Sequence, residues 1–235
     1  MTQLALYIHI PYCLEKCPYC DFHSIPVKRP EIPAQSYMKR VLEELRHSCE
    51  EHALFGRELV SVFIGGGTPS LIAPEDYRPL FEAIQEIFGV NPTREVTLEA
   101  NPATVSLARL QDYREIGVNR LSLGAQSFQP RLLKKLGRNH SAKEAEEAIG
   151  LGFESGFQNI SCDLIFGIES QTFEELICDM EMAAQFPLKH LSVYQLTVEA
   201  NTPLHTWIQS GRTSLPEEDV LVAMQIGRAS CRERV

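Results

Sequence analysis

The chain has 235 residues, of which 44% are hydrophobic and 23% charged, with a formal net charge of −9. This balance is typical of a globular protein, and the acidic charge disfavours nucleic acid and anionic membrane surfaces, which both require a basic face. The N-terminus lacks the basic start of a secretory signal, and its apolar run is too short to span a bilayer. We therefore expect a cytoplasmic protein with no membrane span, whose seven cysteines do not form a disulfide framework.

Predicted strands alternate along the chain with predicted helices. The strand-like runs are short, apolar and bounded by Gly, Pro or Asn, and they cover residues 4–10, 59–64, 95–100, 119–124, 159–166 and 190–196. A loop at 30–34 leads into a long helix through residue 51, and apolar residues at helical spacing predict helices over 75–88 and 172–185. The last of these opens with Thr172 and Glu175, the spacing of a capping box.

Six βα units in series predict an α/β fold with a parallel sheet, and both a doubly wound sheet and a β/α barrel fit this pattern. The alternation stops before Pro203. We expect residues 1–200 to form the core and residues 201–225 to begin a further region that this chain does not complete. Residues 226–235 break the preceding apolar periodicity and resemble the translation of a sequencing adapter, so we interpret them as a non-native tail.

Polar residues that a core does not need stand at the ends of the predicted strands. Three cysteines follow the first strand, a glycine-rich run at 65–69 follows the second, and Glu99 lies at the end of the third. Gln126 follows the fourth strand, and Asp163 lies within the fifth. Because the carboxyl ends of parallel strands meet at one edge, these groups are expected to form one site.

The cysteines Cys13, Cys17 and Cys20 occupy a single predicted loop. Three thiolates can hold three irons of a [4Fe–4S] cluster and leave the fourth iron open, which is the arrangement of a catalytic metal site. Zinc is the alternative, because His23 completes a Cys-x3-Cys-x2-Cys-x2-His pattern.

The other candidate residues each have a plainer explanation. The 65–69 run can be a tight turn, or a loop whose exposed backbone approaches the amino and carboxylate groups of an amino-acid ligand. It is not a phosphate-binding loop, because it lacks the Gly-Lys-Ser/Thr ending. Glu99 and Asp163 can be strand-end carboxylates that reach water. Arg138 can belong to a solvated basic stretch or pair with a ligand carboxylate, and Tyr7 and Phe22 can be ordinary strand or core residues.

A family resemblance rests on several of these segments together. Residues 7–13, Tyr-Ile-His-Ile-Pro-Tyr-Cys, and the Cys-Asp-Phe of residues 20–22 resemble the signature of the radical S-adenosylmethionine (SAM) superfamily. The resemblance runs from about residue 4 to residue 204. It implies a partial (β/α)6 TIM-like barrel, a [4Fe–4S] cluster ligated by Cys13, Cys17 and Cys20, and SAM on the open iron, where it can be cleaved reductively. It also implies a set of cofactor contacts, namely Tyr7, Phe22, Gly66, Gly67, Thr68, Glu99, Gln126, Arg138 and Asp163.

The segments also resemble one branch of the superfamily, which holds the oxygen-independent coproporphyrinogen III oxidases and the haem chaperones. The oxidases carry a fourth cysteine where this chain has Phe22, so we favour a haem chaperone and keep the decarboxylating oxidase as the alternative. A zinc-stabilised β/α protein of unrelated function is the weaker alternative. The branch implies haem or porphyrin as ligand, haem-accepting proteins as partners, and an electron donor such as a flavodoxin or ferredoxin.

Overall fold

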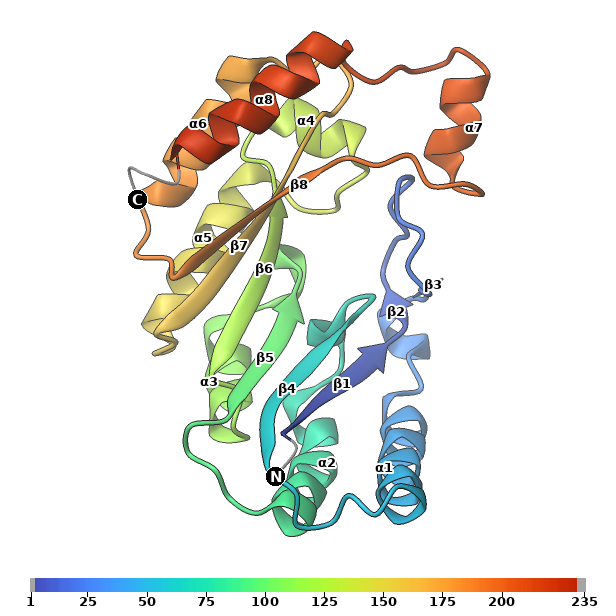
Figure 1. Cartoon of the computed structure of the whole chain (residues 1–235), viewed down its shortest axis with the longest axis vertical. Helices are drawn as coiled ribbons and strands as arrows, with labels where there is room; N and C mark the ends of the chain where they lie inside the picture. The colour runs from blue at the N-terminus through green and yellow to red at the C-terminus, as the bar shows by residue number, and fades with distance from the viewer. Residues whose placement is uncertain (1–2, 232–235) are drawn as a thin grey trace.

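The computed structural model describes residues 3–231, with side chains placed through residue 226. Six parallel strands form one curved sheet (Figure 1), in the spatial order β1-β4-β5-β6-β7-β8. The strands are β1 (Leu4–Ile10), β4 (Leu59–Gly66), β5 (Glu95–Ala100), β6 (Arg120–Gln126), β7 (Asn159–Phe166) and β8 (His190–Gln195). Two short segments, β2 (Tyr12–Cys13) and β3 (Ile25–Pro26), pair with each other beside the sheet.

The helices follow the strands as the alternation predicts. They are α1 (Ala34–Glu51), α2 (Pro74–Phe88), α3 (Leu107–Glu115), α4 (Pro130–Lys135), α5 (Ala142–Glu154), α6 (Phe173–Ala184), α7 (Pro203–Gln209) and α8 (Glu218–Cys231). The capping box is confirmed, because the Thr172 hydroxyl accepts from the Glu175 N–H and the Glu175 carboxylate accepts from the Thr172 N–H. No helix among the described residues is long and apolar enough to cross a membrane.

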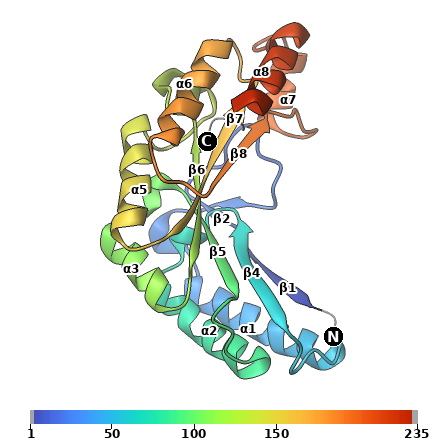
Figure 2. The ribbon, with the colours of Figure 1, turned by 60° about the vertical axis from the view of Figure 1, so that its left-hand side comes forward.

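The sheet is wound in one direction only. Its strand order follows the chain order without a reversal, and Figure 2 shows α1, α2, α3, α5 and α6 on one face of it. A doubly wound sheet would reverse its order and carry helices on both faces. The fold is therefore the partial barrel, with β1 and β8 as its two edges.

Alternation of side chains along the strands separates the core from the barrel interior. In β6, Leu121 and Leu123 are fully buried in the core shared with the helices. The residues between and beside them, Arg120, Ser122 and Gly124, line an interior cavity. Burial of the apolar residues against the helices fixes the register, and the register in turn aims the polar residues inward.

Two strands extend further than their apolar runs predict. β4 continues through Gly65 and Gly66 because these residues stay in register with His9 and Ile10 of β1. β6 continues to Gln126 after an irregularity in its pairing with β7. Both extensions bring residues of the interior cavity to the carboxyl edge of the sheet.

The C-terminal helices pack on the barrel. α8 lies against α6 (Figure 1), and Met224 is fully buried in the main core. The Leu204 N–H at the start of α7 donates to the Pro18 carbonyl at 2.9 Å, which joins α7 to the cysteine loop. Of the expected tail 226–235, residues 226–231 continue α8 and residues 232–235 lie outside the described part of the chain.

Candidate functional site

One cavity of about 610 Å³ opens at the carboxyl ends of the strands. Its volume is in the range of small-molecule sites. Eleven of the twelve residues predicted from the sequence line this cavity. They are Cys13, Cys17, Cys20, Phe22, Gly66, Gly67, Thr68, Glu99, Gln126, Arg138 and Asp163. The strand-end positions thus converge as expected for parallel strands.

Tyr7 is the predicted residue that does not line the cavity. Its ring is 55% exposed and stacks on Phe63, a lining residue, with the ring centroids 6.2 Å apart. Its hydroxyl lies 3.0 Å from His9 Nδ1. Tyr7 therefore touches the wall of the cavity from outside.

Backbone hydrogen bonds hold the cysteine loop at both ends. The Ile25 N–H donates to the Pro11 carbonyl at 2.6 Å, and the Val27 N–H donates to the Cys13 carbonyl at 2.8 Å. Within the loop, the Cys20 N–H donates to the Cys17 carbonyl at 3.1 Å. These contacts turn the loop so that all three cysteines face the same cavity.

Two of the sulfur atoms accept hydrogen bonds from other predicted residues. The Thr68 hydroxyl donates to Cys13 Sγ at 3.6 Å, and the Arg138 guanidinium donates to Cys17 Sγ through Nη1 at 3.5 Å. Burial raises the pKa of the Cys20 thiol, an effect that the Phe22 N–H partly offsets. Donors aimed at sulfur favour thiolates, which are the form that binds iron.

The glycine loop must lack side chains to fit against the cysteine loop. A Cβ on Gly67 would lie 2.7 Å from the Tyr12 carbonyl oxygen and 2.9 Å from Cys13 Sγ. A Cβ on Gly66, whose φ is +113°, would lie 2.7 Å from the His9 ring. The triple glycine is therefore required by close approach at these two positions.

The two carboxylates lie in different surroundings on the cavity wall. Burial raises the pKa of Glu99 to about 7, with the charge of Asp163 adding to the rise and a hydrogen bond from the Gly66 N–H opposing it. That N–H donates to Glu99 Oε2 at 3.1 Å. Asp163 accepts from the Ser122 hydroxyl at 2.7 Å. The pair presents acceptors to any ligand that carries hydroxyl or amino groups.

Gln126 and Arg138 meet over Gly124 on the cavity wall. Gln126 has a φ of +67°, a conformation that non-glycine residues rarely adopt. Arg138 donates to the Gly124 carbonyl through Nη2 at 3.1 Å, and its Nε is buried with no hydrogen-bond partner among the described residues. An unpartnered guanidinium donor beside a cavity is available to a ligand carboxylate.

Sequence reasoning missed His140 beside Arg138. His140 is 5% exposed and its Nε2–H donates to the Ala125 carbonyl at 3.0 Å. Burial, together with the charge of Arg138, lowers the pKa of His140 to about 4, so the ring is neutral at physiological pH. It ties the Arg138 segment to the end of β6.

Sequence reasoning also missed Asp179 of α6. Its carboxylate is 1% exposed and accepts from the Ser127 hydroxyl at 2.6 Å, the Phe128 N–H at 2.8 Å and the Gln129 side chain at 3.2 Å. Asp179 therefore anchors the loop that directly follows Gln126. The available signal was an acidic residue on the apolar face of a predicted helix, three positions after Leu176.

The structure does not bring His23 into the cavity with the cysteines. The His23 backbone carbonyl accepts from His9 Nε2 at 2.7 Å, and its ring lies 6.1 Å from the His9 ring. Among the side chains that the structure describes, through residue 226, no three of His, Cys, Asp or Glu are placed to hold a single metal ion. A cluster needs no such convergence, because each cysteine binds its own iron.

The chain belongs to the radical SAM superfamily, whose family model matches residues 7–183. Membership implies a [4Fe–4S] cluster and SAM as cofactors, and it removes the alternative of an unrelated zinc-stabilised protein. Among curated relatives, the haem chaperone HemW of Haemophilus influenzae is 40% identical over 94% of this chain and 57% of that protein. HemW of Escherichia coli is 41% identical over the same shares of the two chains. The chain thus spans about half the length of the curated relatives it matches.

Solved structures support the fold. The coproporphyrinogen III oxidase HemN from Escherichia coli superposes with a TM-score of 0.84, at 24% identity, over 98% of this chain and 52% of that one. An archaeal Elp3 superposes with a TM-score of 0.62 at 17% identity, over 94% of this chain and 52% of that one. Likeness at these identities establishes a common barrel and leaves function to the site.

Proposed function

We propose that this chain is the cluster- and SAM-binding part of a haem chaperone. The observation that carries the proposal is the convergence of three cysteines, a glycine loop, two carboxylates and an arginine on one cavity. Haem handling comes from likeness to proteins named haem chaperone, at 32% to 41% identity. Sequence likeness to that group exceeds the 24% identity to the oxidase, and Phe22 stands where the oxidases carry their fourth cysteine.

Cys13, Cys17 and Cys20 would hold the [4Fe–4S] cluster. Their shared cavity, the donors aimed at two of the sulfurs and the close approach of Gly67 to Cys13 support this assignment. The cluster, when bound, supplies an electron for reductive cleavage of SAM. The protein's contribution is to hold three irons and leave the fourth accessible.

The remaining cavity residues fit SAM. Arg138 has an unpartnered Nε to offer a carboxylate. The backbone of Gly66, Gly67 and Thr68 lines the cavity, where its carbonyl groups can accept from the amino group of an amino-acid moiety. Asp163 and Glu99 would accept from hydroxyl or amino groups. Gln126, Phe22 and Tyr7 complete the contacts that we assign, with Tyr7 acting through Phe63 rather than from the cavity lining.

The partners follow from the same proposal. We assign haem or a porphyrin as ligand, haem-accepting proteins as recipients, and a flavodoxin or ferredoxin as electron donor, all in the reducing cytoplasm. Residues 1–200 would be the functional core, residues 201–225 the start of a further region, and residues 226–235 a non-native tail. The contact of α7 with the cysteine loop supports a role for the further region in shaping the site.

The test separates a haem chaperone from an oxidase. The full chain, with its cluster reconstituted anaerobically, is incubated with SAM and a reductant and offered haem or coproporphyrinogen III. Stable haem binding, with transfer to an apo-haem protein and no decarboxylated product, is the expected result. Formation of protoporphyrinogen IX would reject the chaperone assignment in favour of the oxidase.

A further inference from the structure

Asn101 connects three segments of the cavity wall that come from different parts of the chain. It stands two residues after Glu99, directly beyond the end of β5. Its backbone is hydrogen-bonded to Ser70, in the short turn η2 (Pro69–Leu71) that follows the glycine loop, and its side chain to Asn139, the neighbour of Arg138. Asn101 and Asn139 both line the cavity. Asn101 is therefore placed to hold the three segments together.

A closed ring of hydrogen bonds joins the Asn101 backbone to the η2 turn. The Thr104 hydroxyl donates to the Asn101 carbonyl at 2.8 Å, and the Asn101 N–H donates to Ser70 Oγ at 3.2 Å. Because the single proton of the Thr104 hydroxyl is used in this way, the Ser70 hydroxyl is the donor to Thr104 Oγ1, at 2.6 Å. Both hydroxyls are buried, so loss of any bond in the ring would leave an unsatisfied polar group. The ring thus fixes the end of β5 against the η2 turn.

Arg109 of α3 holds the rest of that turn. Its guanidinium donates to the carbonyls of Ser70, Leu71 and Ile72 at 3.1, 3.0 and 2.8 Å. A planar guanidinium that makes three such bonds leaves the turn little freedom to move. The η2 turn is therefore a rigid support for Asn101.

The Asn101 side chain extends from this support to the segment 137–140, which we call the Arg138 segment. Its Oδ1 accepts from the Ala103 N–H at 3.0 Å and so caps the short helix η3 (Pro102–Thr104). A backbone N–H can only donate, so this bond identifies the amide oxygen and leaves Nδ2 as the donor toward Asn139. Nδ2 donates to Asn139 Oδ1 at 3.1 Å. The side chain thus bridges the end of β5 and the Arg138 segment.

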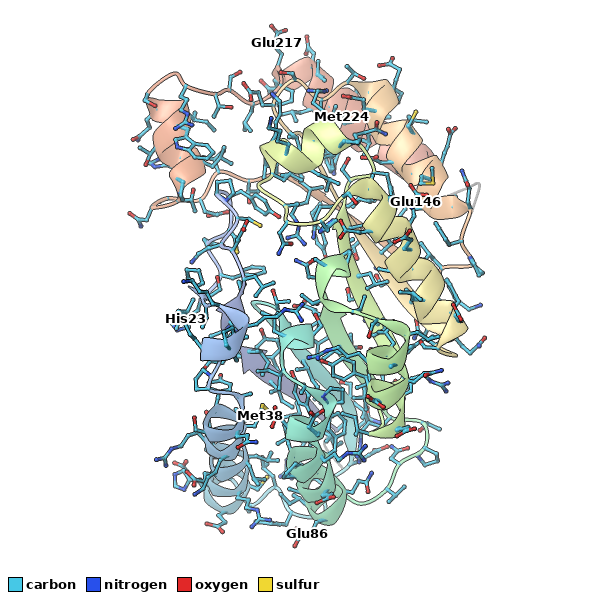
Figure 3. All side chains as sticks on the ribbon, turned by 180° about the vertical axis from the view of Figure 1, so that it is seen from behind. His23, Met38, Glu86, Glu146, Glu217 and Met224 are labelled. Carbon is cyan, nitrogen blue, oxygen red and sulfur yellow. The ribbon has the colours of Figure 1, made fainter. Side chains whose placement is uncertain are left out.

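The bridge joins parts of the cavity wall that the sheet keeps apart. In the strand order, β4 and β5 lie between β1 and β6. Figure 3 shows His23, on the segment that follows the cysteines, and Glu146 of α5, the helix that follows the Arg138 segment, on opposite sides of the molecule. Two other hydrogen bonds tie the Arg138 segment to β6. The Asn101 side chain adds a link from that segment to β5 and the η2 turn.

We propose that Asn101 is a positioning residue for SAM, which holds the Arg138 guanidinium at a fixed spacing from the glycine loop. This inference rests on the proposed binding of SAM in the cavity, with its carboxylate at Arg138 and its amino group at the glycine-loop carbonyls. Those two groups stand on the same carbon atom of SAM, so their protein partners must keep one spacing to bind both at once. Groups that bind a ligand together need support from further side chains to hold such a geometry.

A helix cap is the plainer role for the Asn101 side chain. Asparagine is among the preferred N-cap residues, and the bond from the Ala103 N–H would alone account for it. Serine is about equally preferred at this position and accepts the same bond. Its side chain is one atom shorter and has no amide donor for Asn139. Asn101→Ser therefore keeps the cap and removes the bridge, whereas Asn101→Ala removes both.

The experiment measures SAM affinity by calorimetry on the reconstituted full chain, with iron content and thermal unfolding in parallel. Asn101→Ser and Asn101→Ala should both bind SAM about fivefold more weakly than the wild type, with unchanged iron content, and the alanine variant should have the lower Tm. Asn139→Ala should show the same loss of affinity, and combining it with Asn101→Ser should add nothing, because both changes break one bond. The control is Ser106→Ala, which removes the exposed cap of α3 and should lower Tm without changing SAM affinity.

Four outcomes would overturn the inference. If the wild type binds SAM and Asn101→Ser binds it equally well, Asn101 is only a cap, while the assignment of SAM to the cavity stands. If the losses in Asn101→Ser and Asn139→Ala add together in the double variant, the two residues do not act through their mutual bond. If Ser106→Ala loses as much affinity, SAM binding follows stability alone. If the wild-type chain binds no SAM, the proposed function fails together with this inference.

Discussion

Replacement of Asp179 by alanine should destabilise the protein and weaken SAM binding together. The buried carboxylate accepts hydrogen bonds from the Ser127 hydroxyl, the Phe128 N–H and the Gln129 side chain. Alanine leaves the first two donors buried without acceptors, at about 1–3 kcal/mol each. Relief of the buried charge offsets part of this cost, so we expect a net loss of about 3 kcal/mol, or about 6–12 °C in Tm for a chain of this size.

Asparagine separates the hydrogen bonds of Asp179 from its charge. Asp179→Asn keeps an oxygen for the Phe128 N–H, and the Ser127 hydroxyl can rotate to accept from the new amide, so we expect a cost below about 1 kcal/mol. Burial raises the pKa of Asp179 above the ordinary value of 3.8. The folded state therefore binds the Asp179 proton more tightly than the unfolded state. Proton binding thus stabilises the fold at low pH, and this stabilisation is lost as pH rises from 3.8 through the pKa of Asp179 in the folded state. The stability of Asp179→Asn relative to the wild type should accordingly increase as pH rises.

The assay is thermal unfolding by circular dichroism at about pH 5 and about pH 8, with SAM affinity measured on the reconstituted chain. The control is Asp112→Ala, which removes an exposed carboxylate of α3 and should change neither quantity. SAM affinity should fall in Asp179→Ala because the anchored loop directly follows Gln126. Equal stability of Asp179→Ala and the wild type would refute the reasoning, as would an asparagine variant as damaged as the alanine variant.

Two further predictions concern the cavity, and one concerns the end of the chain. SAM affinity should fall as pH drops below about 7, where Glu99 becomes protonated. Glu99→Gln should abolish this pH dependence, and a variant that keeps the wild-type pH profile would contradict the role of Glu99. Gly67→Ala should lower the iron content of the reconstituted chain, because its Cβ would clash with the Tyr12 carbonyl and Cys13 Sγ. Full iron loading would show that the glycine loop can move to accommodate the methyl group. Sequencing the genomic DNA downstream of codon 225 should reveal a coding sequence different from that of residues 226–235, and genomic sequence that continues through the present codons would disprove the non-native tail.

Much of the barrel could be predicted from local pattern. Three strands, Leu4–Ile10, Glu95–Ala100 and Asn159–Phe166, begin and end where their apolar runs do, because burial on the helix side and turn residues at the ends act over a few positions. The direction of sheet winding could not be predicted, because it depends on which strands pair across the fold. Strand pairing decided between the two architectures that the pattern allowed.

The residues that line the cavity could be predicted from local pattern, but the residues that hold them in place could not. Strand ends of a parallel sheet meet at one edge, so Cys13, Glu99 and Asp163 could be placed together without knowing their distances. Asp179 acts on residues far away in the sequence, and the α7 contact with Pro18 joins segments from the two ends of the chain. Such long-range contacts leave no periodic trace in the sequence.

The central claim is that Cys13, Cys17 and Cys20 hold a cluster with one iron open to SAM. Anaerobic reconstitution of the full chain, followed by iron and sulfide analysis and electron paramagnetic resonance of the reduced protein, tests it directly. We expect about four irons per chain and a spectrum that changes when SAM is added. Cys17→Ala should lose the irons and the spectral change. The control Cys178→Ala, which removes an exposed thiol outside the cavity, should keep them. Full iron loading in Cys17→Ala, or about one tightly bound zinc and no iron in the wild type, would contradict the account.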